Sequence, residues 1–150
     1  MKQTKLRLTI CSLLLVAILA FIWGNSAMPG QESGELSGWV AELLQTVFPF
    51  LSLESGVGMY LLRKLAHFSE FCVLGLCLGW LLGMVKEKPL FWLPWLCGTF
   101  AAVVDETIQL FSPGRYSSPI DVSIDSCGVL AGVTFLLLCT VLTKKKTKTK

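Results

Sequence analysis

The sequence predicts an all-α membrane protein, a polytopic helical bundle with four transmembrane helices and an outer amphipathic segment. Of its 150 residues, 53% are hydrophobic and only 15% are charged, against about 25% in typical soluble proteins. Four apolar segments are each long enough to cross the hydrocarbon core, which takes about 20 helical residues. Because four such spans occupy over half of the chain, we expect one membrane domain over residues 1–150 and no separate soluble domain.

The four predicted spans cover residues 6–23, 64–85, about 89–111 and about 120–142. The first follows basic residues, as a secretory signal does, but it exceeds the usual apolar core of about 7–15 residues. Asn25 also occupies the wrong place for a cleavage site ending at Ala27, so we expect a retained helix. The linker at residues 86–88 is so short that the second and third spans form an antiparallel hairpin.

An amphipathic segment separates the first two spans. Apolar residues recur there at helical spacing in a stretch too short to cross a membrane: Trp39, Val40, Leu43, Leu44, Val47, Phe48 and Leu51. We interpret this segment as a helix that rests in the headgroup zone on the outer surface or covers the bundle. The alternative is an ordinary connecting loop.

Glycines at four-residue spacing predict one close helix contact. Gly75, Gly79 and Gly83 form a double GxxxG pattern in the second span, and Gly128 with Gly132 forms another in the fourth. Because this spacing lets helix backbones approach closely, we expect the second and fourth spans to pack together.

The charge distribution predicts an orientation. Basic residues at both termini and in the linker at residues 86–88 fall on one side of a four-span bundle, and by the positive-inside rule both termini are cytoplasmic. Residues 143–150 form a basic cytoplasmic tail, which we expect at an anionic lipid leaflet. No aromatic residues interleave its lysines, so we predict no nucleic-acid partner. The outer side, where this rule predicts few basic residues, carries Arg63, Lys64 and Arg115. These three residues are candidates for ion pairs with nearby carboxylates.

The most informative feature is a set of ionisable residues near the outer ends of the spans. Each such group costs roughly 2.5–3.5 kcal/mol at mid-span, so its presence needs a structural or functional reason. At a rise of 1.5 Å per residue, five of them lie about 4–9 Å from the outer end of their span: His67, Glu70, Asp105, Glu106 and Asp125. Three helices therefore bring polar groups to one level.

Helical spacing also places these groups on one face of each helix. Arg63, His67 and Glu70 follow i, i+4, i+7 spacing, and Asp105 and Gln109 lie one turn apart. Asp121, Asp125, Gly128 and Gly132 share a stripe on the fourth span.

The loop between the third and fourth spans carries a Pro113-Gly114 turn signal, which places Arg115 above the polar residues. We expect Arg115 to pair with Asp121 or Asp105, or to hold a phosphate or carboxylate ligand.

In the pieces RKLAHFSEFCVLG, VVDETIQLFSPGR and SPIDVSIDSCGVLAG, the chain resembles the VanZ-like family of bacterial membrane proteins, named for a teicoplanin-resistance protein. The match runs from about residue 63 to residue 132. An asparagine usually stands in this pattern where the chain has Asp125. The positions that carry the pattern are Lys64, His67, Glu70, Asp105, Glu106, Gln109, Pro113, Gly114, Arg115, Asp121 and Gly128. The resemblance implies a multi-pass protein of the bacterial plasma membrane, linked to the cell envelope and to glycopeptide antibiotic resistance, without a known reaction.

Three functions remain open for the polar residues. One is a recognition site for an envelope precursor, a lipid headgroup or a lipoglycopeptide, with Trp39 supplying apolar contact, through which the protein contributes to teicoplanin-like resistance. Another is a membrane-embedded hydrolase or transferase acting on an envelope or lipid-linked substrate, with acid/base residues among His67, Glu70, Asp105 and Glu106. In either case the predicted ligand-binding residues are Lys64, Gln109, Arg115, Asp121 and Asp125. The third is a purely structural network of ion pairs that sets the helix register.

No metal motif is present. One histidine, His67, with Glu70, Asp105 or Glu106 at unfixed distances is a weak ligand pattern. The six cysteines lie within apolar segments and form no CxxC pair, so we predict no zinc site or disulfide framework. We accordingly predict no metal and no cofactor.

Overall fold

Five helices account for most of the described part of the chain. The computed structural model describes residues 2–51, 53, 55–85 and 91–148, and the side chains of residue 2 and residues 144–148 are not described. The helices are α1 (Lys2–Ala27), α2 (Gly30–Val47), α3 (Gly56–Val85), α4 (Trp92–Phe111) and α5 (Pro119–Lys148). Within these ranges the chain forms no strand, which confirms the all-α prediction. The predicted inner linker at residues 86–88 and most side chains of the basic tail lie outside the described residues.

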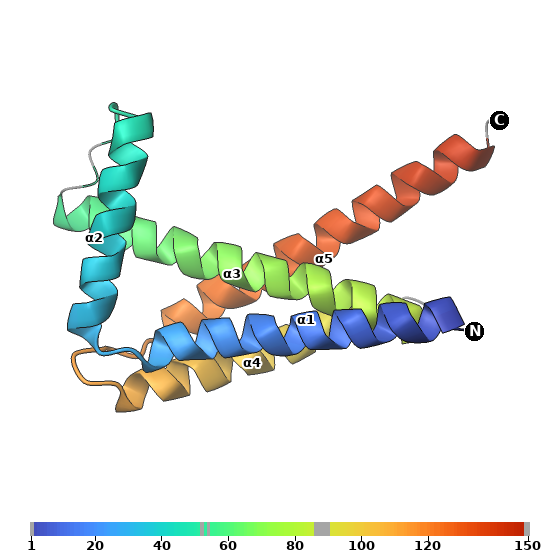
Figure 1. Cartoon of the computed structure of the whole chain (residues 1–150), viewed down its shortest axis with the longest axis horizontal. Helices are drawn as coiled ribbons and strands as arrows, with labels where there is room; N and C mark the ends of the chain where they lie inside the picture. Colours follow the sequence, from blue (N-terminus) through green and yellow to red (C-terminus); the bar gives the residue numbers. More distant parts are fainter. Residues whose placement is uncertain (1, 52, 54, 86–90, 149–150) are drawn as a thin grey trace.

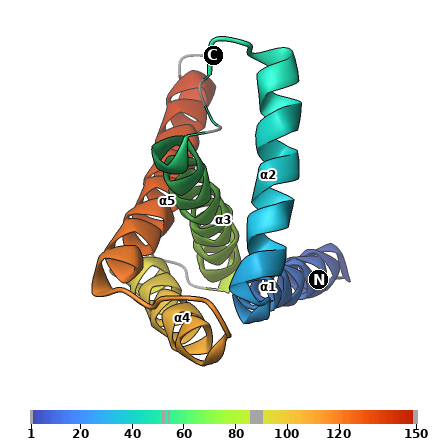
Figure 2. The same ribbon diagram turned by 90° about the vertical axis from the view of Figure 1, so that its left-hand side faces the viewer.

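The long helices α1, α3, α4 and α5 run along the molecule, and α2 lies crosswise at one end (Figure 1). The end of α1, the beginning of α3 and the loop between α4 and α5 all lie at this end. The beginning of α1 and the end of α5 lie at the opposite end (Figure 1). In a view along the long helices, α2 begins beside α1 and extends away from it, on the side of the molecule where α3 begins (Figure 2).

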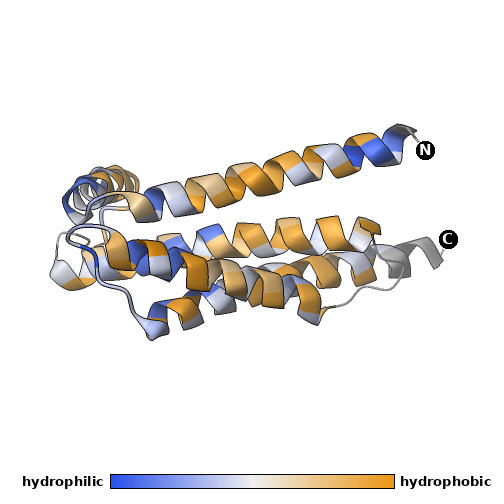
Figure 3. Cartoon of the chain, turned by 90° about the horizontal axis from the view of Figure 1, so that it is seen from below, coloured by the Kyte–Doolittle hydropathy of each residue, from blue (hydrophilic) through white to orange (hydrophobic). Residues whose placement is uncertain are grey.

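Within the described part of the chain, three helices are long and apolar enough to cross a membrane: Gln3–Ala27 in α1, Gly56–Val85 in α3 and Pro119–Thr143 in α5. Helix α4 is not among them, although a fourth span was predicted there. Asp105, Glu106 and Gln109 lower its average hydropathy, and all three side chains are buried against the rest of the protein. Apolar residues dominate the middle of the long helices, and polar ones gather near α2 and at the start of α1 (Figure 3).

Helix α3 begins at Gly56, earlier than the predicted span, which began at residue 64. The prediction began the span at the charged pair Arg63-Lys64, but residues 57–62 are largely apolar too, and the helix runs through the charged pair without a break. Arg63, Lys64 and His67 therefore lie two to three turns inside a continuous helix, which holds their side chains in fixed relative directions.

The predicted contact between the second and fourth spans is confirmed in α3 and α5. A Cβ added to Gly75 would meet the backbone of Val129, and one added to Gly132 would meet the backbone of Cys72. Gly128 approaches the carbonyl oxygen of Phe68 in the same way. Gly83 has open space around it and takes no part in the contact, because α5 diverges from α3 toward the end of the molecule opposite α2 (Figure 1).

The amphipathic segment is a helix, so the loop alternative is wrong. Helix α2 contacts α3. The backbone amide of Gly30, its first residue, donates a hydrogen bond to the carbonyl oxygen of Pro113 (2.8 Å). Gly114 follows with a φ of 71°, a conformation that L side chains rarely adopt. Four apolar residues form an exposed stripe along α2: Leu36, Trp39, Leu43 and Val47.

Candidate functional site

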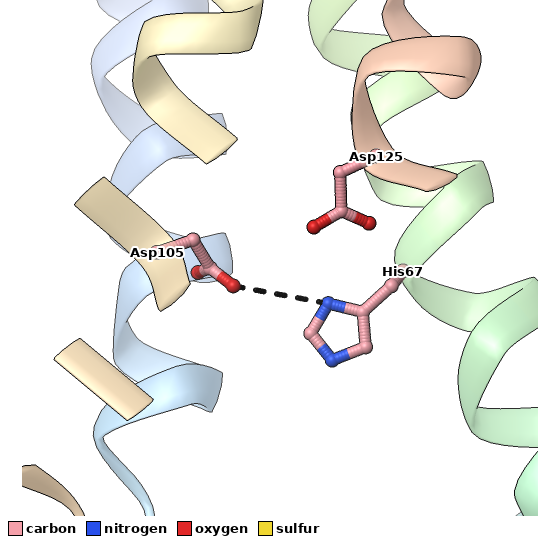
Figure 4. Close-up of side chains that lie close together, drawn as sticks. All are labelled: His67, Asp105 and Asp125. Atoms are coloured by element: carbon pink, nitrogen blue, oxygen red, sulfur yellow. Dashed lines mark ion pairs between the residues drawn. The ribbon is translucent and has the colours of Figure 1, made fainter. Parts of the chain in front are cut away.

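Three ionisable side chains from three helices meet near the end of the bundle that carries α2. His67 comes from α3, Asp105 from α4 and Asp125 from α5, and one donor atom of each lies within 4.8 Å of the others. The Nδ1 atom of His67 is 3.9 Å from Oδ2 of Asp105. In Figure 4 the two carboxylates and the imidazole ring point toward a common space. Asp105 and Asp125 are only 0% and 1% exposed, while His67 is half-buried.

Asp105 is held by side chains from its own helix and from α1. The amide nitrogen of Gln109 donates to Oδ2 of Asp105 (2.8 Å), and it also contacts the hydroxyl of Ser26 (3.3 Å). The hydroxyl of Ser112 donates to the carbonyl of Ser26 (2.9 Å). Gln109 thus positions a carboxylate, and the end of α1 is part of the site.

Glu106 and Asp121 face the loop between α4 and α5. The backbone amide of Ser118 donates to Oε2 of Glu106 (2.8 Å), which fixes the entry of the chain into α5. Asp121, in the first turn of α5, forms an ion pair with Lys64 of α3. A carboxylate in the first turn also interacts favourably with the helix dipole.

Arg115 does not form the ion pair that was predicted for it. Its guanidinium donates to the carbonyl oxygens of Asn25 (2.6 Å) and Met28 (3.2 Å), and thereby caps the C-terminal end of α1. It does not pair with Asp121, whose partner is Lys64, or with Asp105. Burial lowers the pKa of the Arg115 guanidinium from its ordinary value, but arginine stays protonated in proteins, so a positive charge stands here.

Glu70 lies apart from the group of His67, Asp105 and Asp125. Its Oε1 atom accepts a long hydrogen bond from the amide nitrogen of Asn25 (3.4 Å). It lines a mainly apolar cavity of about 240 Å³ between α1, α2 and α3, together with Phe21, Leu36 and Val40.

A larger cavity, about 530 Å³ in volume, lies on the other side of His67. Seven of the nine residues predicted for the site line it: Lys64, His67, Glu106, Gln109, Arg115, Asp121 and Asp125. Arg63, which was not predicted as a site residue, lines it as well. Arg63, His67 and Arg115 line both cavities. The two spaces therefore flank one set of basic side chains. Trp39 lines neither of them, and 62% of its surface is exposed.

Several buried polar atoms in this region lack a hydrogen-bond partner among the described residues. They are Nδ1 of His67, Oε2 of Glu70, Oδ1 of Asp105 and both carboxylate oxygens of Asp125. Native proteins rarely leave such groups unpaired, because burial without a partner costs free energy. The polar side chains of this region are therefore not all hydrogen-bonded to one another within the described residues.

The sequence interpretation missed the contribution of α1. Asn25 and Ser26 bind Glu70 and Gln109, although only their position at the polar end of an apolar helix distinguishes them. The C-terminal end of α1 lies at the same depth as the predicted polar groups. This shared depth could have identified Asn25 and Ser26 from the sequence.

Comparisons with known proteins extend the resemblance. A sequence model of a family described as VanZ/LLP1 matches residues 11–141, which include α2 and most of α1 as well as the motif region. No curated protein and no solved structure matches the chain.

Proposed function

The chain belongs to the VanZ/LLP1 family, and on that premise we propose that its polar cavity binds an anionic group of an envelope precursor or lipid at the outer surface of the bacterial plasma membrane. Through this binding the protein lowers sensitivity to teicoplanin-like glycopeptides. The observation that carries the proposal is the 530 Å³ cavity lined by Arg63, Lys64 and Arg115. Its volume is in the range of small-molecule sites, and guanidinium groups suit phosphates and carboxylates.

Arg63 is the basic residue best placed to bind a ligand. Lys64 is engaged by Asp121, and Arg115 is engaged by the end of α1. Within the described ranges, no ion pair or side-chain hydrogen bond engages Arg63, which is half-buried and lines both cavities. An amphiphile would therefore place its anionic group beside Arg63 and an apolar portion in the smaller cavity against Phe21 and Leu36.

The proposed topology has four spans, with α4 as the fourth. Asp105, Glu106 and Gln109 of α4 face the protein, whereas Leu96, Phe100, Val103 and Leu110 are exposed as a lipid-facing side requires. In this proposed topology both termini lie in the cytoplasm. The exposed apolar stripe of α2 then lies in the outer headgroup zone, because α2 crosses the opposite end of the bundle (Figure 1).

Thiol labelling tests this topology. In a cysteine-free variant carrying Ser117→Cys, a membrane-impermeant maleimide should label intact cells. The same variant carrying Thr4→Cys instead should be labelled only after the membrane is permeabilised. The reverse pattern would overturn the orientation.

The binding proposal is tested with Arg63→Gln in a susceptible bacterium that expresses the protein. Losing a charge-assisted hydrogen bond costs about 1.5–3 kcal/mol, which weakens binding about 10- to 150-fold. We expect the teicoplanin sensitivity of these cells to approach that of cells without the protein. Arg7→Gln, the same change at the exposed opposite end, is the matched control and should retain resistance.

Two results would contradict the proposal. If cells with and without the protein are equally sensitive to teicoplanin, the resistance role is lost. If Arg63→Gln and Arg7→Gln behave alike at equal expression, the cavity is not the binding site. A purely structural network gives this second result.

A catalytic function is the second candidate, and the contact between His67 and Asp105 favours it. A buried carboxylate beside Nδ1 can orient an imidazole and stabilise its protonated form, leaving Nε2 for acid/base work on a bound ester. The test incubates purified protein with bacterial lipid extract and follows headgroup release or exchange by mass spectrometry. Turnover by the wild type that is lost in His67→Gln would establish it, and no turnover would refute it.

A further inference from the structure

We propose that His67, Asp105 and Asp125 bind one divalent transition-metal cation, of the Zn²⁺ or Mn²⁺ type, beside the larger cavity. The proposal concerns this group of three side chains, called the triad below, and it holds whatever the cavity itself binds. Each member comes from a different helix, so the cation would join α3, α4 and α5 (Figure 4).

The donor atoms are close to the spacing that a cation requires. Zinc binds imidazole nitrogen and carboxylate oxygen at about 2.0–2.2 Å, which sets neighbouring donors about 3.4 Å apart in a tetrahedral site. One donor atom of each side chain lies within 4.8 Å of the others, and Nδ1 of His67 is 3.9 Å from Oδ2 of Asp105, the oxygen that Gln109 also holds. Rotations of the three side chains would have to close this difference of up to about 1.4 Å.

Atoms of the triad without a hydrogen-bond partner point to a cation site. Asp125 is 1% exposed, and neither of its carboxylate oxygens has a hydrogen-bond partner among the described residues. Oδ1 of Asp105 and Nδ1 of His67 are likewise buried without a hydrogen bond. The triad therefore presents free donors from all three side chains. Two buried carboxylates beside each other are costly, and a divalent cation would neutralise both.

The neighbouring basic residues do not supply this compensation. Lys64 pairs with Asp121, one turn before Asp125, and Arg115 donates to carbonyl oxygens of α1. Arg63 lines the cavity but forms no ion pair with the triad in the described structure.

The donor set indicates the class of metal. Imidazole nitrogen with carboxylate oxygens suits Zn²⁺, Mn²⁺ and related ions, whereas Ca²⁺ and Mg²⁺ prefer oxygen alone. Gln109 holds Oδ2 of Asp105 at 2.8 Å and leaves Oδ1 free, which is the support that metal-ligating carboxylates usually have. Three protein donors leave coordination positions open, and His67 and Asp125 both border the larger cavity.

The experiment titrates Co²⁺ into the purified, chelator-treated full chain in detergent and records its visible absorption spectrum. We expect one equivalent of Co²⁺ to bind with nitrogen and oxygen ligand-field bands and without thiolate charge-transfer bands. The latter criterion excludes binding to the six free cysteines. Zn²⁺ should displace the bound Co²⁺, whereas Mg²⁺ at the same concentration should not.

Three variants locate the site. Asp125→Asn and His67→Gln should each weaken Co²⁺ binding at least tenfold. Glu42→Gln, which removes a carboxylate from the exposed side of α2, should leave Co²⁺ affinity within about twofold, because Glu42 lies outside both cavities. Far-UV circular dichroism verifies that each variant is folded.

The wild-type titration decides the proposal even if a variant does not fold. Absence of stoichiometric Co²⁺ binding by the folded wild type would overturn it. Binding that persists in folded Asp125→Asn and His67→Gln, or that shows thiolate bands, would overturn it equally.

Discussion

Gly132 provides a quantitative test of the contact between α3 and α5. An alanine Cβ at this position would overlap the carbonyl oxygen of Cys72 and lie 2.9 Å from the backbone nitrogen of Leu76. Ordinary van der Waals contact begins at about 3.4 Å, and backbone atoms cannot rotate away as a side chain can. In Gly132→Ala the two helices must therefore move apart locally and lose part of their packing.

The magnitude follows from a comparison with Gly83→Ala. Overpacking a close contact costs about 1–3 kcal/mol, while alanine stabilises a helix by roughly 0.5–1 kcal/mol relative to glycine. Gly83 has open space around it, so Gly83→Ala carries only the second effect. Because both variants share this helix preference, the difference between their unfolding free energies isolates the steric cost of about 1–3 kcal/mol.

The assay is reversible unfolding of the purified protein in mixed detergent micelles, with increasing SDS and circular dichroism as the readout. We expect Gly132→Ala to be less stable than the wild type and Gly83→Ala to be equal to it or more stable. If the two variants agree within about 0.5 kcal/mol, then α3 and α5 do not approach as described.

Three further predictions concern single interactions. A double-mutant cycle with Lys64→Met and Asp121→Leu should give a coupling free energy of roughly 0.5–3 kcal/mol in the same unfolding assay, because the ion pair is largely shielded. Arg115→Gln should accelerate amide hydrogen exchange near the end of α1, measured by mass spectrometry, since two carbonyl oxygens lose their charged donor. Phe71→Ala should lower the unfolding free energy by about 2 kcal/mol or more, because Phe71 is fully buried, whereas Phe100→Ala on the exposed side should change it little.

Each of these has a clear contrary result. A coupling free energy near zero would mean that Lys64 and Asp121 do not interact. Unchanged exchange at the end of α1 in Arg115→Gln would remove the capping role. Equal destabilisation by Phe71→Ala and Phe100→Ala would place both rings in the same environment and contradict the described core.

The level of the polar groups could be predicted because helix rise is regular. Counting 1.5 Å per residue from the outer end of each span brought His67, Asp105 and Asp125 to one depth, and the structure places these three side chains together. The same counting could not separate Glu70 from them. Glu70 shares the stripe of His67, yet it lies beside Asn25 and the smaller cavity.

The pairing of the charged residues could not be predicted in the same way. Arg115 was expected to bind Asp121 or Asp105, but it caps α1, and Lys64 binds Asp121 instead. Arg115 lies in a loop whose path depends on the amide of Gly30 bonding to Pro113. Such contacts join segments far apart in the chain, and no periodic pattern encodes them.

The sequence by itself determined the helical class, the amphipathic nature of α2 and the glycine contact between α3 and α5. It also determined which ionisable residues lie at one depth near the outer ends of the spans. These properties follow from composition and from the 3.6-residue repeat, which are local. Only the tertiary structure decided which donors converge, which charges are already paired and where the cavities lie. Those outcomes depend on the rotation and tilt of each helix against its neighbours, because a small rotation redirects a side chain by several ångströms while the sequence pattern stays the same.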